Sequence, residues 1–269
     1  MAQDWIMRIW GVRGSMPTPL QDVMEYGGNT ACISVDCGED LVVFDAGTGL
    51  VNLGRSLTGK RPVHLLFSHV HLDHLLGLFV FPPFHDPNAE IHLYGESRNG
   101  VPFRQQLEAL VGPPYWPVGF ADFPARITFH EIGPDQQFAL PGGRTVRTMR
   151  GNHPNLGLIY RLEDGQRSVV YTLDCELTAE LRPRLTAFCR NADVLVWDAN
   201  FTSADLARHP GWGHSSWEQG VELRRDAGAG LVIMTHYNQS YTDAFLREQE
   251  LSAQGPGVRF AREAMEVRL

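Results

Sequence analysis

The residues between positions 65 and 74 have side chains that could bind metal ions. An apolar run at 65–67 leads into three histidines and an aspartate within six residues, at His69, His71, Asp73 and His74. His69 and His71 are two positions apart, so their side chains point the same way in an extended segment. Neutral imidazoles and a carboxylate suit zinc, and also iron or manganese. A histidine-rich surface loop is the alternative, but this spacing directly after an apolar strand favours a metal site.

Three later residues are of the same chemical types, and two of them directly follow apolar runs; what singles them out is the family resemblance described next. His153 precedes Pro154, Asp174 follows the run 169–173, and His236 follows the run 231–235. Taken singly, each has an ordinary explanation, as a loop histidine, a turn-forming aspartate and a buried core histidine. Their significance depends on the order in which they follow the histidine-rich segment.

The pattern His69-x-His71-x-Asp73-His74 resembles the HxHxDH signature of the metallo-β-lactamase superfamily. Four other segments resemble its phosphodiesterase and ribonuclease Z-like branch: Gly-Gly-Asn-Thr with a following cysteine at 27–32, Asp-Ala-Gly-Thr-Gly at 45–49, an aromatic-Pro-Val segment at 115–118, and Gly-Trp-Gly-His-Ser-Ser-Trp at 211–217. The likeness extends over nearly the whole chain. It implies an α/β fold, a four-layer αβ/βα sandwich, in a single domain over residues 1–269.

The resemblance also implies a ligand set for two divalent metal ions, zinc in the first instance and manganese or iron as alternatives. One metal would take His69, His71 and His153, the other Asp73, His74 and His236, with Asp174 bridging them. A hydroxide in the remaining bridging position would attack the substrate, and Asp73 would help to orient it. Asp45 is expected either to support this site or to form an ordinary turn.

His214 resembles the histidine of this branch that binds no metal but helps to protonate the leaving group. A positioned proton donor of this kind contributes about 10²–10⁴ in rate. Its ordinary explanation is a loop histidine before a helix. The other histidines match nothing in the family pattern and are expected to be structural or at the surface; they are His64, His85, His92, His130 and His209.

The sequence departs from its relatives at three places. The final motif reads His236-Tyr-Asn-Gln rather than His-His-Asp-Pro, although Asp243 matches a later position. This puts the substrate in question more than the metals. Only 20 residues separate His153 from Asp174, which leaves no room there for the tRNA-gripping arm of ribonuclease Z. Position 71 is histidine rather than the glutamate of oxygen-reducing diiron relatives, which favours hydrolysis over redox chemistry.

These residues must be positioned by strands and helices, and both patterns occur along the chain. Runs rich in Val, Ile, Phe and Tyr between turn-forming residues predict strands at 6–10, 31–36, 41–45, 63–67, 90–94, 126–130, 144–149, 157–162, 168–173, 194–197 and 231–235. Helical patterns lie at 49–57, 97–110, 178–190, 215–227 and 242–253. In the fourth helix, Ser215 and Glu218 have the spacing of a capping box.

Composition narrows the class of protein. The chain has 269 residues, 43% of them apolar, which is enough for a sizeable core. Its net charge of −8 predicts that tRNA and duplex nucleic acid are not partners, although bound cations could still attract a small anionic substrate. Four cysteines without a paired motif predict reduced thiols in a cytoplasmic protein. We expect no signal peptide and no membrane partner, and a homodimer is left open.

The first hypothesis is therefore hydrolysis of a small phosphodiester, such as a cyclic nucleotide or cyclic sugar phosphate. Hydrolysis of a carboxylic ester, thioester or lactone at the same two-metal site is the second. A binding protein without catalysis on the same fold is the third, and the complete ligand set disfavours it. Two aromatic and proline-rich segments, at 79–84 and 115–117, could form an apolar wall beside the metals or simply pack in the core.

Overall fold

The computed structural model describes residues 4–58, 61–253 and 255–269, which form two compact units. Among these residues, the first unit comprises those of Met1–Gly11, Asn29–Gly133 and Ala264–Leu269, and the second those of Val12–Gly28 and Pro134–Glu263. Each unit contains one mixed sheet of seven strands. That residues 1–269 form a single domain stays a prediction.

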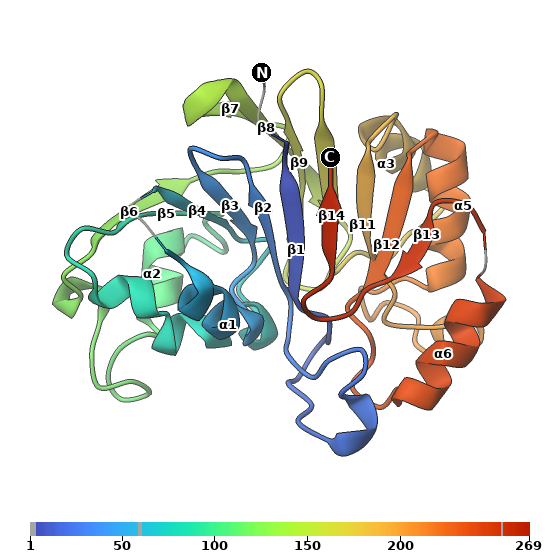
Figure 1. The fold of residues 1–269 in the computed structure, drawn as a ribbon, viewed down its shortest axis with the longest axis horizontal. Helices are drawn as coiled ribbons and strands as arrows, with labels where there is room; N and C mark the ends of the chain where they lie inside the picture. The colour runs from blue at the N-terminus through green and yellow to red at the C-terminus, as the bar shows by residue number, and fades with distance from the viewer. Residues whose placement is uncertain (1–3, 59–60, 254) are drawn as a thin grey trace. The chain divides into compact units, whose positions relative to one another are not determined.

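The sheet of the first unit has the order β14-β1-β2-β3-β4-β5-β6 (Figure 1). Its strands are β1 Ile6–Gly11, β2 Cys32–Asp36, β3 Leu41–Phe44, β4 Val63–Leu66, β5 Glu90–Gly95, β6 Arg126–Glu131 and β14 Glu266–Arg268. Pairing is antiparallel from β14 to β3 and parallel from β3 to β6. The unit also contains helices α1 Gly49–Ser56 and α2 Phe103–Glu108.

The core of the first unit is formed by apolar side chains of its central strands and of α1. Val43 of β3, Leu65 of β4 and Leu93 of β5 belong to one buried apolar cluster. Leu50 and Leu53 of α1 belong to the same cluster. The apolar side of α1 packs on β1 and β2, and its leucines join the same core as the central parallel strands.

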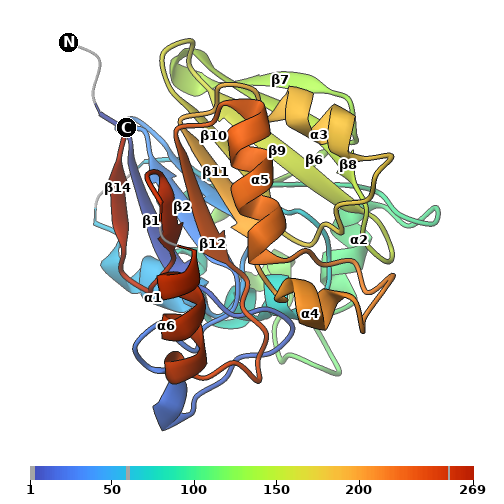
Figure 2. The ribbon, with the colours of Figure 1, turned by 90° about the vertical axis from the view of Figure 1, so that its right-hand side faces the viewer.

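The sheet of the second unit has the order β13-β12-β11-β10-β9-β8-β7. Its strands are β7 Gln137–Leu140, β8 Arg144–Gly151, β9 Gly157–Glu163, β10 Ser168–Thr172, β11 Val194–Asp198, β12 Leu231–Thr235 and β13 Val258–Phe260. Strands β10 to β13 are parallel, and β7 to β10 are antiparallel. The helices are α3 Arg182–Phe188, α4 Ser203–Leu206, α5 Trp217–Ala227 and α6 Asp243–Ser252, with α5 packed on β11 and β12 (Figure 2).

All eleven strands expected from the sequence are present, with ends that differ by no more than two residues. The strands that the sequence did not predict are β7, β13 and β14, which are only three or four residues long. Short 3₁₀ turns occur at Gln21–Val23, Leu72–His74, Leu76–Val80, Pro82–His85, Phe120–Asp122 and Pro141–Gly143. The helix expected at 97–110 begins only at Phe103, because Arg98 and Val101 pair as a short bridge and Pro102 precedes the helix.

The capping box of α5 lies one residue later than expected. The Ser216 side chain accepts a hydrogen bond from the backbone of Gln219, whose side chain accepts one from the Ser216 backbone. The hydroxyl of Ser215 instead donates to the carbonyl of Cys175 at 2.5 Å. The prediction of Ser215 and Glu218 was therefore wrong by one position, because Ser215 is engaged by another loop.

The structure also bears on the cysteines and on the membrane. Cys32, Cys37, Cys175 and Cys189 are buried, and none of them forms a disulfide in the structure as described. Within the described ranges, no helix has both the length and the apolar character needed to cross a bilayer.

Candidate metal centre

The functional side chains of the first unit follow the carboxyl ends of two neighbouring parallel strands. Asp45 comes directly after β3, and the segment 68–74 follows β4. Because parallel strands end at the same edge of a sheet, this edge is where polar side chains can gather. Asp45 has a φ of 58°, a left-handed conformation that aspartate tolerates better than most residues. This conformation turns the chain sharply where the strand ends.

The four predicted ligands of this unit lie close together. The ring centroid of His69 is 4.3 Å from those of both His71 and His74. The Nε2 atom of His74 lies 3.2 Å from Oδ2 of Asp73. His69, Asp73 and His74 are buried, and His71 is partly exposed. The structure therefore brings together the HxHxDH residues as a compact set of nitrogen and oxygen donors.

The carboxylate of Asp45 orients two of these histidines, His74 directly and His69 through the hydroxyl of Ser68. Its carboxylate accepts hydrogen bonds from the backbone N–H of Ser68 at 2.7 Å, from the Ser68 hydroxyl at 2.8 Å and from Nδ1 of His74 at 2.7 Å. The Ser68 hydroxyl gives its proton to Asp45, so it accepts from Nδ1 of His69, 3.0 Å away. Both rings then carry their proton on Nδ1 and present Nε2 as the ligand atom. Of the two roles expected for Asp45, support of the site is the one this geometry favours.

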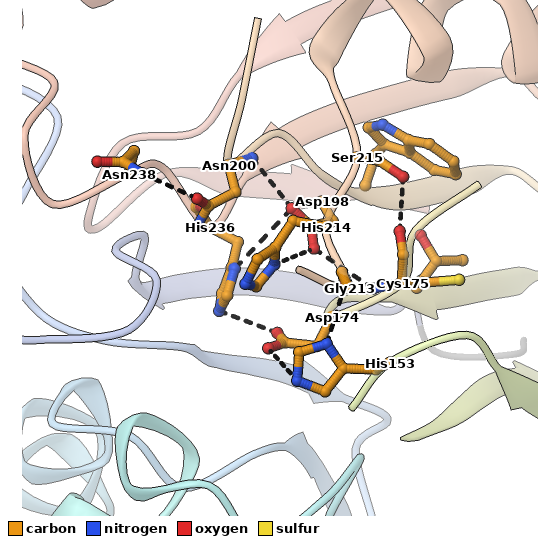
Figure 3. A network of polar contacts seen from close by, with 12 residues as sticks. His153, Asp174, Cys175, Asp198, Asn200, Gly213, His214, Ser215, His236 and Asn238 are labelled. Atoms are coloured by element: carbon orange, nitrogen blue, oxygen red, sulfur yellow. Dashed lines mark hydrogen bonds and ion pairs between the residues drawn. The ribbon is translucent and has the colours of Figure 1, made fainter. Parts of the chain in front are cut away.

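In the second unit, Asp174 follows β10 and His236 follows β12. Figure 3 shows both side chains together with His153. The Nε2 atom of His236 lies 3.0 Å from Oδ1 of Asp174, and Nε2 of His153 lies 3.4 Å from Oδ2. One carboxylate thus reaches two imidazoles, one with each oxygen. Asp174 and His236 both have positive φ, 55° and 63°. Backbone in this sparsely populated region is common at functional sites, where surrounding contacts impose it.

His153 is held in the orientation that a metal ligand requires. Its Nδ1 donates to the carbonyl of Gly213 at 2.9 Å, so Nε2 carries the lone pair and faces Asp174. Burial lowers the pKa of His153, more than Asp174 raises it. The ring is therefore kept neutral, which is the form that binds a metal.

His214 has a carboxylate partner that the sequence interpretation missed. Its Nδ1 lies 2.9 Å from Oδ2 of Asp198, the last residue of β11 (Figure 3). Burial disfavours the charged form of His214, but the charge and hydrogen bond of Asp198 outweigh it and raise the pKa. Ligand atoms of Asp174, Asp198, His214 and His236 all lie within 4.8 Å of one another. The signal for Asp198 was available, since it ends an apolar strand as Asp174 does.

The aromatic and proline-rich segments at 79–84 and 115–117 were expected either to pack in the core or to form an apolar wall. Phe81 and Phe84 are fully buried in the core cluster of the first unit, so that segment serves mainly for packing. The ring of Phe79 lies 5.0 Å from that of Trp116, and Tyr115 is exposed.

Among the histidines outside the family pattern, His64 is buried on β4 and stacks on His92 with ring centroids 4.9 Å apart, a structural contact.

Comparison with known proteins extends these observations. The family model described as the beta-lactamase superfamily domain matches residues 34–237. Ribonuclease Z from Thermoplasma acidophilum is 26% identical over 293 residues, which cover 90% of this chain and 89% of the relative. The structure of the metallo-beta-lactamase fold protein YhfI from Bacillus subtilis has 20% identity and a TM-score of 0.73, with 99% of each chain covered. The short form of human tRNase Z has 17% identity and a TM-score of 0.71, with 97% of this chain and 98% of that chain covered.

These relatives correct one expectation, that tRNA is not a partner. The expectation rested on the net charge of −8 and on the short interval between His153 and Asp174. The hairpin of β9 and β10 occupies that interval, yet a relative matching nine tenths of the chain is a ribonuclease Z and a similar structure is a tRNase Z. Net charge is an average over the whole surface, and it does not describe the field around the residues that bind a substrate.

Proposed function

Since the chain belongs to the beta-lactamase superfamily of metallo-hydrolases, in its ribonuclease Z-like branch, we propose that it hydrolyses phosphodiester bonds with the help of two divalent metal ions. Its fold is the α/β metallo-β-lactamase fold expected from the sequence. The observation that carries the proposal is the pair formed by His214 and Asp198, an oriented imidazole beside Asp174 and His236. Such a group serves a reaction whose leaving group needs a proton.

The residues present fit two metals. In the proposed ligand set, His69, His71 and His153 would hold one metal, Asp73, His74 and His236 would hold the other, and Asp174 would serve both. In support, hydrogen bonds at Nδ1 of His69, His74 and His153 orient Nε2 as the ligand atom in each case. Imidazole and carboxylate donors suit zinc, with manganese and iron as alternatives. When bound, two cations lower the pKa of a shared water and neutralise charge that develops on the substrate.

The protein's own groups then have distinct roles. Asp198 holds Nδ1–H of His214, so Nε2 of His214 is the atom that hydrogen-bonds the phosphate and gives a proton to the departing alkoxide. Asp198 is itself fixed, because the backbone N–H of Asn200 donates to it at 3.0 Å. Asp73 orients the attacking water through the carboxylate that faces His74. The buried setting of these groups strengthens each interaction relative to water.

Within this class we favour a small phosphodiester, such as a cyclic nucleotide or cyclic sugar phosphate. In support, the His and Asp donors and the paired His214 lie close together, so they can act on a single phosphodiester group. The ribonuclease Z relatives support a second candidate, RNA. Hydrolysis of a carboxylic ester, thioester or lactone is the alternative chemistry, and the ribonuclease Z relatives make it the weaker one.

A metal-reconstituted activity screen tests the proposal. The protein is loaded with zinc, manganese or iron and assayed on cyclic nucleotides, a linear dinucleotide, a precursor tRNA with a 3′ extension, and matched esters, thioesters and lactones. We expect the highest kcat/KM on a phosphodiester, with the cyclic compounds ahead of the linear and RNA substrates. A preference for esters or lactones by tenfold or more would contradict the proposal, whereas a preference for the precursor tRNA would select the second candidate.

We also propose that the protein works in a reducing compartment, the cytoplasm. In support, its four cysteines are buried thiols, and burial raises the pKa of Cys175 to about 12. Thiols in this state are poor nucleophiles and are consistent with a core role rather than with a disulfide framework.

A further inference from the structure

Trp212 is a large apolar side chain in an unusual position. It is 59% exposed and lies two residues before His214, the proposed proton donor. Its neighbours in the chain are Gly211 and Gly213, so no other side chain stands directly beside the indole along the backbone. A Cβ placed on Gly211 would meet no atom within 4 Å outside its two chain neighbours, so the loop is not packed against other segments at this point.

The loop that carries Trp212 is held on both sides of the indole. The carboxylate of Glu176 accepts from the backbone N–H of Gly211 at 3.1 Å and from that of Gly213 at 3.0 Å. Gly213 also lies against His153, since a Cβ there would be only 2.3 Å from Nδ1 of that ring. These contacts fix the loop relative to a proposed metal ligand, so the indole is presented at a defined place despite its exposure.

Aromatic rings connect the indole to His214. The ring of His209 lies edge-on to Trp212, with centroids 4.5 Å apart, and stacks on Phe201 at 4.9 Å with an interplanar angle of 4°. Phe201 in turn lies 5.9 Å from His214. His209 is anchored by a hydrogen bond from Nδ1 to the carbonyl of Asp205 at 2.8 Å. The indole is thus supported by packed rings, and little conformational entropy is lost when a ligand stacks on it.

We infer that Trp212 is a specificity-determining residue that stacks on a flat ring, a nucleobase, carried by the arm of the phosphodiester nearest His214. This inference rests on the proposed function and narrows its substrate class to nucleoside phosphodiesters. Stacking of a base on an aromatic side chain changes affinity by about 5- to 150-fold. It tolerates all bases because each presents a π face, so Trp212 selects for the presence of a base rather than for its identity.

Two ligands that share a ribose and a phosphate, but of which only one carries a base, measure how much the base contributes to binding. Adenosine 5′-monophosphate and ribose 5-phosphate are titrated calorimetrically into the metal-loaded wild type, W212F and W212A. We expect the wild type to bind the nucleotide at least fivefold more tightly. W212A should lose most of this difference and W212F should keep part of it, while all three bind ribose 5-phosphate alike. Indole fluorescence should be quenched by the nucleotide in the wild type and less in W212F.

The inference would be overturned if the wild type showed no preference for the nucleotide, or if W212A weakened both ligands equally. Hydrolysis of a phosphodiester without a base, such as methyl nitrophenyl phosphate, is measured in parallel on the wild type. Absence of that hydrolysis would count against the proposed function itself, whereas retained hydrolysis without base preference would count only against Trp212. Because Trp212 is exposed, the folded content of W212A should match that of the wild type by circular dichroism.

Discussion

The Nδ1 atom of His214 lies 2.9 Å from Oδ2 of Asp198, and both side chains are buried. This contact fixes which nitrogen of His214 faces the reacting group and favours the protonated ring. It also joins the loop before α5 to the end of β11, two segments that are separated in the chain by 16 residues. His214, the proposed proton donor, is therefore placed by the sheet and not by its loop alone.

Replacement of His214 should show whether this residue protonates the leaving group of a phosphodiester. In H214A we expect the loss of about 10²-fold or more in kcat/KM on an alkyl phosphodiester, whose alkoxide needs a proton to leave. The loss on a nitrophenyl phosphodiester should be much smaller, since nitrophenolate leaves without one. Metal content should not change, because His214 is outside the proposed ligand set. Equal losses on both substrates would remove His214 from the mechanism.

The role of Asp198 is tested by D198N, which keeps the shape of the side chain and removes its charge. We expect a loss of about 10- to 10²-fold on the alkyl phosphodiester, because the amide no longer stabilises the charged ring of His214. The double variant D198N/H214A should be no slower than H214A, since Asp198 acts through His214. Additive losses in this cycle would show that Asp198 acts on its own.

The metal content of D174A should identify the bridging ligand. We expect about two divalent metals per chain in the wild type and a joint loss of metal and activity in D174A, because Asp174 faces both His153 and His236. Elemental analysis after reconstitution measures this. D164A is the matched control, since Asp164 caps the turn between β9 and β10 and should leave both metals in place. A wild-type stoichiometry of one or less would refute the two-metal proposal.

Substitution of Asp45 should weaken a site that it does not itself coordinate. D45N removes the charge that holds Nδ1–H of His74 and the Ser68 hydroxyl, so metal affinity should fall about 10- to 100-fold. Competition with a chromophoric chelator gives this affinity. S68A, which removes the hydroxyl contacts to Asp45 and His69 but keeps the bond between Asp45 and His74, should have a smaller effect in the same direction. Unchanged affinity in D45N, with a lower melting temperature alone, would assign Asp45 a purely structural role.

Gly14 should be sensitive to the addition of a single methyl group. A Cβ there would lie 2.5 Å from Nδ2 of Asn200 and 2.6 Å from Nδ1 of His236, so G14A must displace the imidazole. We expect lower metal affinity and a loss of activity that excess metal partly restores. At Gly255 a Cβ would meet nothing within 4 Å, which makes G255A the matched control. Equal behaviour of the two variants would contradict the close packing of Gly14 on His236.

The proposed metal ligands could be identified from the sequence because their types and order are constrained by chemistry. His69, Asp174 and His236 each stand just after an apolar strand, and such positions are visible as a change from apolar to polar residues. The fold class followed from the same alternation together with the family resemblance.

Other features depended on tertiary contacts that no local pattern reveals. The partnership of Asp198 with His214 joins the end of β11 to the loop before α5, and a strand-end aspartate has several ordinary roles. Ser215 and Ser216 are equally good helix caps by propensity, and only the contact of Ser215 with Cys175 decides between them. The prediction that tRNA is not a partner was wrong for a different reason. It used the net charge of the whole chain to judge how the residues of one site bind a substrate.

The pairing of β1 with β14 gives the last residues of the chain an influence on its first strand. Ile6 lies opposite Arg268, so the outer edge of β1 is covered by a segment made about 260 residues later. Until that segment is synthesised, β1 presents unsatisfied backbone groups that can pair with another chain. A ribosome-bound or C-terminally clipped chain is therefore exposed to edge-to-edge aggregation, and tags at the C-terminus need a linker long enough to leave Glu266–Arg268 seated on β1.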